Sequence, residues 1–248
     1  VRLLTRTSRN VSMTEGGERL YVSVAPRLEE IEAEIAAVAE YRDHPAGTVR
    51  ITASEHVANT VVWPRLADVL PRYPDLKVEL TIDYGLADIV EQRYDIGIRL
   101  GERVAQDMIA VPVTGPQRMA IVGSPAYFRT HAAPQRPADL AAHDCIGLRL
   151  PTHGGLMVWD LRRDEQNVNV RVQGQWTFNS SIAMHRAALA GAWLAYLLED
   201  MVLEDIAAGR LMRVMQDWCD VFDGFYAYYP SRRQSSSALR VVIDALRV

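Results

Sequence analysis

Cysteine is scarce in this chain, whose 248 residues contain only Cys145 and Cys219. Two cysteines without a CxxC spacing cannot form a disulfide framework, so a reducing compartment is expected. Long apolar runs are missing as well, because the longest, such as residues 187–198, are far too short to cross a bilayer. No secretory signal peptide opens the sequence. We therefore expect a cytoplasmic protein that makes no contact with a membrane.

An excess of basic residues is also missing. Lys and Arg number 27 against 31 Asp and Glu, which gives a formal net charge of -4. The whole surface of such a chain does not attract nucleic acid. Any contact with DNA must therefore come from a local basic patch.

Catalytic and cofactor motifs are missing too. The sequence contains no GxGxxG, Walker loop, HExxH or GxSxG, and its histidines show no metal-ligand spacing. His143, Asp144 and Cys145 have the chemistry of a nucleophile cluster. Adjacent residues on a strand point to opposite faces, however, so we expect these three to be structural. We expect neither enzymatic activity nor a metal ion or cofactor.

The first 13 residues contain the pattern of a basic hairpin. Thr, Val and Leu alternate with Arg in residues 2–13, and residues 8–10 supply a turn. Arg6, Thr7 and Arg9 are the candidates for contact with DNA phosphates. From charge alone, a solvated basic hairpin at an edge is the preferred interpretation, and DNA contact is the alternative.

A long amphipathic helix is predicted after Thr14, a candidate N-cap. Its apolar residues are spaced three and four apart and form a heptad seam: Tyr21, Val24, Leu28, Ile31, Ile35 and Val38. Pro26 interrupts the seam, so either the helix kinks there or a second helix begins. A lone helix with an apolar stripe needs a partner, and we favour a helix dimer over packing on its own chain. Residues 44–47 then end the helix and form a linker.

From Thr48 onward the pattern alternates between strands and helices. The first unit alternates three strands with two helices, at residues 49–53, 57–70, 77–82, 86–92 and 94–100. This order predicts an open, largely parallel sheet with helices on both faces. A second α/β unit has its elements at residues 119–122, 145–148, 158–161, 168–172, 182–190, 193–197 and 201–208, before a late strand at 225–229 and a closing helix at 238–246.

The chain leaves the first sheet near Gly115 and rejoins it near Gly224, which predicts two lobes that are joined by two crossovers and separated by a cleft.

The tryptophans of the second unit lie in apolar runs without interleaved basic residues. Core positions are therefore favoured over a base-stacking platform for Trp159, Trp176, Trp193 and Trp218.

Segments along almost the whole chain resemble those of LysR-type transcriptional regulators. They are LTRTSRNVSMT at 4–14, YDIGIRLG at 94–101, SPAYF at 124–128, PADL at 137–140, AALAG at 187–191, GRL at 209–211 and YPSRR at 229–233. Their order and spacing, more than any one segment, carry the resemblance. Glu55-His56 and Trp193 depart from the family's pattern, which bears on what the cleft accepts.

The resemblance implies an α/β fold with a two-lobed, type II periplasmic-binding-protein-like effector domain, preceded by a long linker helix and the end of a winged helix-turn-helix. The implied domains are the end of the helix-turn-helix at 1–13, the linker and dimerisation helix at 14–44, lobe I at 48–115 with 226–248, and lobe II at 116–225. The DNA-reading helix of the family is not among these residues, so we expect the sequence to begin partway through a domain.

The resemblance also implies a bacterial transcription regulator that senses a small-molecule co-inducer of unknown identity. Such a protein works as a homodimer or homotetramer, with promoter DNA and RNA polymerase as its partners. The alternative is a solute-binding protein that serves a transporter and has the same two lobes. That alternative predicts a secretory leader, and it leaves the basic hairpin and the heptad helix unexplained.

Ligands of open α/β sheets bind beyond the carboxyl ends of the strands, near helix N-termini. The candidate effector-binding residues follow from that rule and from nearby positive charge: Ser54, Glu55, His56, Arg99, Arg149, Asn179, Ser180 and Ser181. The alternative is that Ser54 and the 179–181 segment serve only as N-caps. Glu55 would repel an anion in the cleft, so either it points away or the effector is neutral or cationic.

Overall fold

The computed structural model describes residues 2–6, 11–39, 45–85, 89, 91–101, 108–150, 155–231 and 237–248. None of the helices in these ranges is long and apolar enough to cross a membrane.

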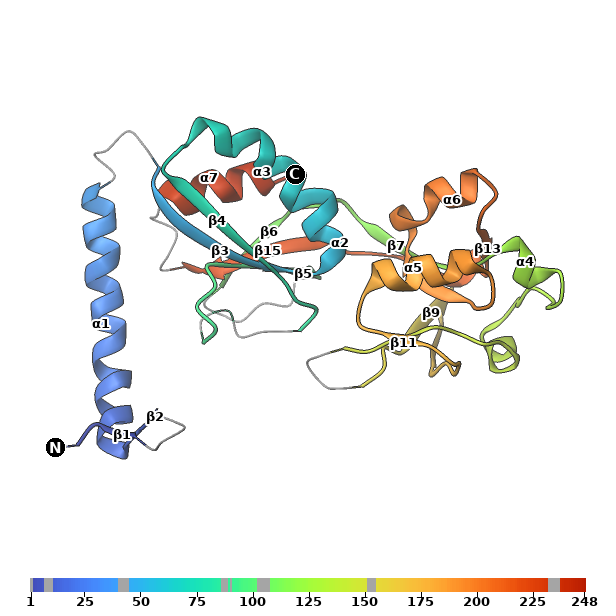
Figure 1. Ribbon diagram of the computed structural model, residues 1–248, viewed down its shortest axis with the longest axis horizontal. Coiled ribbons are helices and arrows are strands. Elements are labelled where there is room, and N and C mark those ends of the chain that lie inside the picture. The colour runs from blue at the N-terminus through green and yellow to red at the C-terminus, as the bar shows by residue number, and fades with distance from the viewer. Residues whose placement is uncertain are drawn as a thin grey trace.

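The N-terminal part is a hairpin followed by a long helix that stands beside the rest of the chain (Figure 1). Strand β1 (Leu4–Arg6) pairs antiparallel with β2 (Val11–Met13), and α1 (Glu15–Ala39) follows. The Thr14 hydroxyl accepts a hydrogen bond from the Gly17 amide at 3.1 Å, which confirms the predicted N-cap. Pro26 lies inside one continuous helix, so no second helix begins there.

Lobe I is built on a five-stranded sheet with the order β4-β3-β5-β15-β6. Its strands are β3 (Gly47–Ala53), β4 (Leu76–Ile82), β5 (Ile96–Leu100), β6 (Met108–Pro112) and β15 (Phe225–Pro230). Strand β3 is parallel to both β4 and β5, as the alternating pattern predicts. Strand β15 is antiparallel to β5 and β6, because the chain returns from lobe II and enters the sheet at the end where β5 leaves off.

The first long helix of lobe I is not a single regular helix. It begins as α2 (Glu55–Val57), continues as a π-helix (Ala58–Val62), becomes α3 (Trp63–Val69) and ends as a 3₁₀ turn (Leu70–Arg72). The uniform helix predicted for 57–70 is therefore wrong in detail. Pro64 has no N–H to donate, and it is accommodated in the first turn of α3, directly after the π-helical turn. The helix predicted for 86–92 falls mostly outside the described residues.

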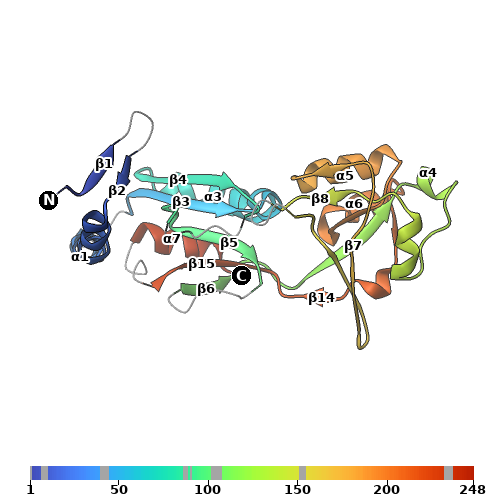
Figure 2. The same cartoon turned by 90° about the horizontal axis from the view of Figure 1, so that it is seen from below.

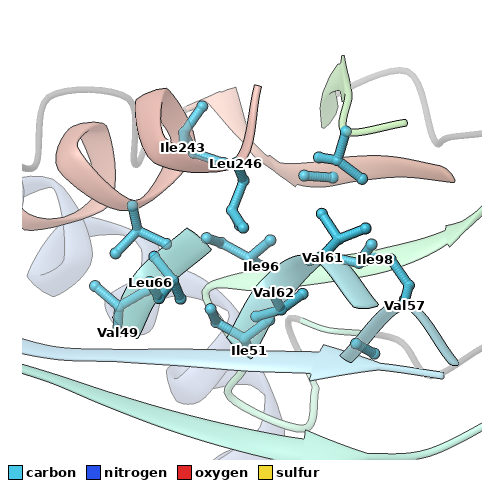
Figure 3. Close-up of a cluster of buried hydrophobic side chains, with 14 of the residues drawn as sticks. Val49, Ile51, Val57, Val61, Val62, Leu66, Ile96, Ile98, Ile243 and Leu246 are labelled. Atoms are coloured by element: carbon cyan, nitrogen blue, oxygen red, sulfur yellow. The ribbon is translucent and has the colours of Figure 1, made fainter. Parts of the chain in front are cut away.

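The core of lobe I lies between the sheet and its helices. The closing helix α7 (Ser237–Leu246) packs on β3 and α3. Figure 3 shows Ile51 and Ile98 from the strands meeting Leu66 from α3 and Leu246 from α7, all buried. Burial of these side chains supplies the main free energy that holds the lobe together.

Lobe II is organised around β7 (Gln117–Gly123). Strands β12 (Ala195–Leu198), β13 (Met212–Val214) and β14 (Val221–Phe222) all pair antiparallel with β7. Two smaller pairs complete it: β8 (Gly147–Leu148) with β11 (Thr177–Phe178), and β9 (Trp159–Arg163) with β10 (Gln166–Val170). The strand predicted for 145–148 is shorter, because Cys145 makes only an isolated bridge to Leu194.

Short helices cover the lobe II sheet. They are α4 (Pro125–Phe128), α5 (Ser181–Ala190) and α6 (Leu203–Ala207), with 3₁₀ turns at Pro137–Ala142, Glu199–Met201 and Gln216–Trp218. Trp159 and Trp218 are buried as predicted, but the core prediction for Trp176 is wrong. Its side chain is 48% exposed and stacks on Phe178, with ring centroids 5.6 Å apart.

The two crossovers between the lobes run side by side (Figure 2). A Cβ on Gly224 would overlap the carbonyl oxygen of Gly115, so only a glycine fits there. The Phe225 amide also donates to the Thr114 hydroxyl at 2.8 Å. The chain therefore leaves and re-enters lobe I at one point, where Gly115 and Gly224 lie in contact.

Candidate functional site: the cleft between the lobes

Helices α2 and α5 face each other across the junction of the lobes (Figure 1). Ser54 follows β3 in extended conformation at the N-cap position of α2, but its side chain makes no cap hydrogen bond. Ser180 caps α5, since its hydroxyl accepts from the Ala183 amide at 3.2 Å. Capping therefore accounts for Ser180 and not for Ser54.

Four side chains bridge the lobes, and we call them the Glu55 latch. Glu55 Oε2 accepts hydrogen bonds from Ser180 Oγ at 2.6 Å and from the Tyr84 hydroxyl at 3.1 Å. The Tyr84 hydroxyl also lies 2.9 Å from Ser181 Oγ and accepts from the Ser181 amide at 3.1 Å. Glu55 and Tyr84 belong to lobe I, and the two serines belong to lobe II. The carboxylate of Glu55 thus points at the N-terminus of α5.

A second bridge joins His56 of lobe I to Asp200 of lobe II, with 2.8 Å between Nε2 and Oδ2. The His56 side chain is only 6% exposed, and its ring centroid lies 6.1 Å from that of Phe225. Together with the Glu55 latch, this pair holds the two lobes closed on each other.

A cavity of about 270 Å³, partly open to solvent, lies between the lobes. Its lining combines five polar or charged residues with a larger apolar set that includes four methionines: Ser54, His56, Tyr84, Arg99, Ser181, Leu100, Met119, Leu148, Leu150, Met157, Met184, Tyr196, Leu197, Leu198, Met201 and Phe225. A wider hollow of about 670 Å³ adjoins it and shares Leu100, Met119, Met157 and Tyr196. A mostly apolar pocket with a few convergent polar groups is typical of small-molecule sites.

Arg99 forms part of the cavity wall but is already engaged within lobe I. Its guanidinium donates to the carbonyls of Gly85, Thr52 and Ile98 at 2.8–3.0 Å and to the Thr52 hydroxyl at 3.0 Å. These bonds use four of its five N–H donors. Burial lowers the pKa of Arg99, because the charge loses hydration. The side chain therefore has little capacity left for a ligand.

The structure gathers half of the predicted effector-binding residues at the cavity. Ser54, His56, Arg99 and Ser181 line it. Glu55 and Ser180 lie behind the wall, in the latch. Arg149 and Asn179 are exposed and do not line this cavity. The part that each residue plays in ligand binding stays a prediction.

Two residues of the site escaped the sequence analysis although the same rule finds them. Tyr84 follows the end of β4, and Asp200 follows the end of β12, just as Ser54 follows β3. The methionines of the wall carry no comparable signal, because methionine packs in any core. Among the described residues, no group of three or more His, Cys, Asp and Glu side chains is placed to hold a metal ion.

The predicted dimerisation seam lies on the open side of α1. Within the single chain, Tyr21, Leu28 and Ile31 are more than half exposed, at 58%, 53% and 55%, and Val24 is 36% exposed. Ile35 and Val38 fall within α1, but their side chains lie outside the described part of the chain. Of the predicted DNA contacts, only the backbone of Arg6 in β1 is described, and Thr7 and Arg9 are not.

Comparison with known proteins agrees with this architecture. The family model for the LysR substrate binding domain matches residues 42–248. A relative described as a putative transcriptional regulator of Pseudomonas aeruginosa is 51% identical over 247 residues, with 100% of this chain and 81% of the relative covered. The HTH-type transcriptional regulator PgrR of Escherichia coli is 40% identical, with 100% and 83% covered.

Among solved structures, CrgA, a LysR-type transcriptional regulator from Neisseria meningitidis, superposes with a TM-score of 0.70 at 27% identity. The alignment covers 99% of this chain and 84% of CrgA. The chain belongs to the LysR family of transcriptional regulators, with an effector domain of two lobes. Its relatives are regulators and not binding proteins of transporters, so the alternative of a solute-binding protein is set aside.

Proposed function

We propose that the cleft between the lobes of this LysR-type regulator binds a small-molecule effector and that the dimer passes the signal to promoter DNA. One observation carries this proposal: a largely apolar cavity, partly open to solvent, lies between lobes that their own side chains bridge. It lies beyond the carboxyl ends of β3 and β12, where ligands of open α/β sheets bind.

The mechanism is a shift between open and closed lobes. An effector shifts this equilibrium only if its affinity for the two states differs. A molecule that fills the cavity touches both lobes at once, so it binds the closed state better. The exposed seam of α1 supports a homodimer or homotetramer, through which closure changes the spacing of the DNA-binding heads.

The wider setting follows from the same proposal. The regulator works in the cytoplasm with RNA polymerase as a further partner, and it needs no cofactor besides the effector. It does not turn the effector over, since His56 is paired with Asp200 and the Ser181 hydroxyl with Tyr84, and neither pair joins a nucleophile to a base.

A screen of small metabolites by thermal shift tests the proposal. A ligand at a hundred times its dissociation constant adds about 2.7 kcal/mol to the free energy of unfolding. Met157→Trp places an indole in the cavity and should abolish the shift of a true effector. Met212→Trp, at a position on β13 that is 43% exposed, is the matched control and should keep it. Equal shifts in both variants would place the effector elsewhere.

A further inference from the structure

The hydroxyl protons at the polar end of the cavity have a fixed direction. An ionised carboxylate only accepts hydrogen bonds, so Ser180 and Tyr84 must both give their protons to Glu55. The single proton of Tyr84 is then spent, and the Ser181 hydroxyl must donate to the Tyr84 oxygen, 2.9 Å away. The Ser181 amide donates to the same oxygen.

As a result, the N-terminus of α5 is already occupied by an anion of the protein itself. Three hydroxyl protons and one amide proton, which could otherwise hold a ligand carboxylate, are directed at Glu55 and Tyr84. Ser181, which lines the cavity, is left with lone pairs that only accept. Arg99 has one N–H left, and His56 is paired with Asp200. Ser54 is the lining residue whose hydroxyl makes no cap hydrogen bond, and it lies in lobe I, away from the N-terminus of α5.

The negative charge of Glu55 is a second reason why an anionic ligand would bind poorly. Its carboxylate lies one hydrogen bond behind the cavity wall, beyond the Tyr84 hydroxyl at 3.1 Å. A ligand anion at this end of the cavity would stand a few ångströms from it, out of bulk water. Repulsion between two like charges is several times stronger in a partly buried site than in bulk water.

From this geometry we propose that Glu55 is a specificity determinant, which excludes anions from the cleft and selects a largely apolar, non-anionic effector with a hydrogen-bond donor that faces Ser181. The inference rests on the proposed effector function of the cleft and names the class of molecule. It also accounts for the lining, in which apolar side chains outnumber the polar ones.

Two fluorescent molecules that differ by one sulfonate test the inference. N-phenyl-1-naphthylamine is uncharged, apolar and carries one N–H, whereas 1-anilinonaphthalene-8-sulfonate is the same molecule with a permanent negative charge. Binding is measured by fluorescence titration on the whole chain, and only the part that Met157→Trp removes is assigned to the cavity and the wider hollow, both of which Met157 lines. For this component of the binding, we expect the wild type to bind the uncharged molecule about tenfold more tightly than the sulfonate. This ratio corresponds to about 1.4 kcal/mol.

Two further variants distinguish the effect of the Glu55 carboxylate from the effect of the protein's overall charge. Glu55→Gln keeps the size of the side chain and an acceptor for Ser180, and it should bring the ratio of the two affinities close to one. Glu79→Gln removes an exposed carboxylate of lobe I that is paired with Arg50, and it should leave the tenfold ratio intact.

The outcomes are distinguishable. If the cavity of the wild type binds the sulfonate as tightly as the uncharged molecule, the role of Glu55 is refuted while the proposed effector site stands. An unchanged ratio in Glu55→Gln refutes it as well. If Met157→Trp removes no binding of either molecule, both the apolar effector and the effector function of the cavity are contradicted.

Discussion

Single residues decide how the lobes meet, and Ser180 has two tasks in this contact. Its hydroxyl accepts from the Ala183 amide as the N-cap of α5 and donates to Glu55 across the cleft. Loss of an N-cap costs about 1 kcal/mol. We expect Ser180→Ala to lower the free energy of unfolding by that amount and by the part of the Glu55 bond that is not replaced by water.

A double-mutant cycle separates the two tasks. Ser180→Ala and Glu55→Ala should be coupled by roughly 1 kcal/mol in denaturant unfolding, since they share a hydrogen bond to a charged group. The matched pair is Ser124→Ala with Glu55→Ala. Ser124 also caps a helix, accepting from the Tyr127 amide at 3.1 Å, but does not touch Glu55. Zero coupling for Ser180 would show that the contact across the lobes contributes nothing to stability.

At this scale the sequence predicts the site in part. The rule that ligands meet polar residues after strands finds Ser54, His56 and Ser181 at the cavity. It cannot tell that Glu55 faces Ser180, because their contact depends on how far the lobes close. For the same reason, the sequence leaves open whether Glu55 points away from the cleft or selects the effector. The structure places its carboxylate behind the wall.

At the scale of elements, hydrogen bonds to the buried carboxylate of Asp205 fasten α5 to α6. Asp205 of α6 accepts from His185 of α5, with 2.6 Å between Oδ2 and Nε2, and from Arg210, which follows α6. Burial disfavours the charge of Asp205, but the hydrogen bonds from Arg210 and His185 outweigh it and lower the pKa of the carboxyl group.

This shift predicts a pH dependence of stability. A carboxyl group whose pKa is lower in the folded state stabilises it above the unfolded value and loses that contribution as the pH falls further. Asp205→Asn should therefore be less stable than the wild type at pH 7, and the two free energies of unfolding should converge below about pH 4. Glu204→Gln, an exposed neighbour in α6, serves as control. A constant difference from pH 7 to about pH 3 would contradict the assignment.

The helix α1 is the element that the sequence predicts best, because period and cap are local properties. The seam side chains that the structure describes, Tyr21, Val24, Leu28 and Ile31, are exposed in the single chain, and burial in a dimer would remove them from water. Leu28→Glu with Ile31→Glu should convert the oligomer to a monomer in sedimentation experiments. Val22→Glu is the control, since Val22 is 72% exposed and lies off the seam. An unchanged mass of the double variant would place the interface elsewhere.

Features that depend on tertiary contacts are harder to predict from the sequence than α1. Trp176 stands between Gln175 and Thr177, and its exposure depends on the short strands β8 and β11, whose pairing is set by tertiary contacts. The π-helical turn at Ala58–Val62 leaves no trace in the apolar spacing either. Strand direction was predicted where helices connect the strands, as between β3, β4 and β5. It was not predicted for β15, which arrives from the other lobe.

At the scale of the whole molecule, two narrow crossovers and two sets of side-chain bridges govern the arrangement of the lobes. The two crossovers pass each other near Gly115 and Gly224, where the backbones lie too close for a Cβ on Gly224. Away from this point, the Glu55 latch and the His56–Asp200 pair close the cleft. These bridges are few and polar, and apolar side chains of lobe II, Leu198, Met119 and Met201, also pack against the core of lobe I.

Removal of both bridges should therefore open the molecule. We expect Glu55→Ala with Asp200→Ala to increase the radius of gyration in small-angle X-ray scattering and to speed hydrogen exchange at the first amides of α5. The control, Glu79→Ala with Asp217→Ala, removes two exposed acids that pair with Arg50 and Arg163 and carries the same change in charge. Since an effector that fills the cavity contacts both lobes, it should restore the smaller radius in the opened variant. Identical scattering from the two double variants would mean that packing between the lobes, and not the bridges, sets their closure.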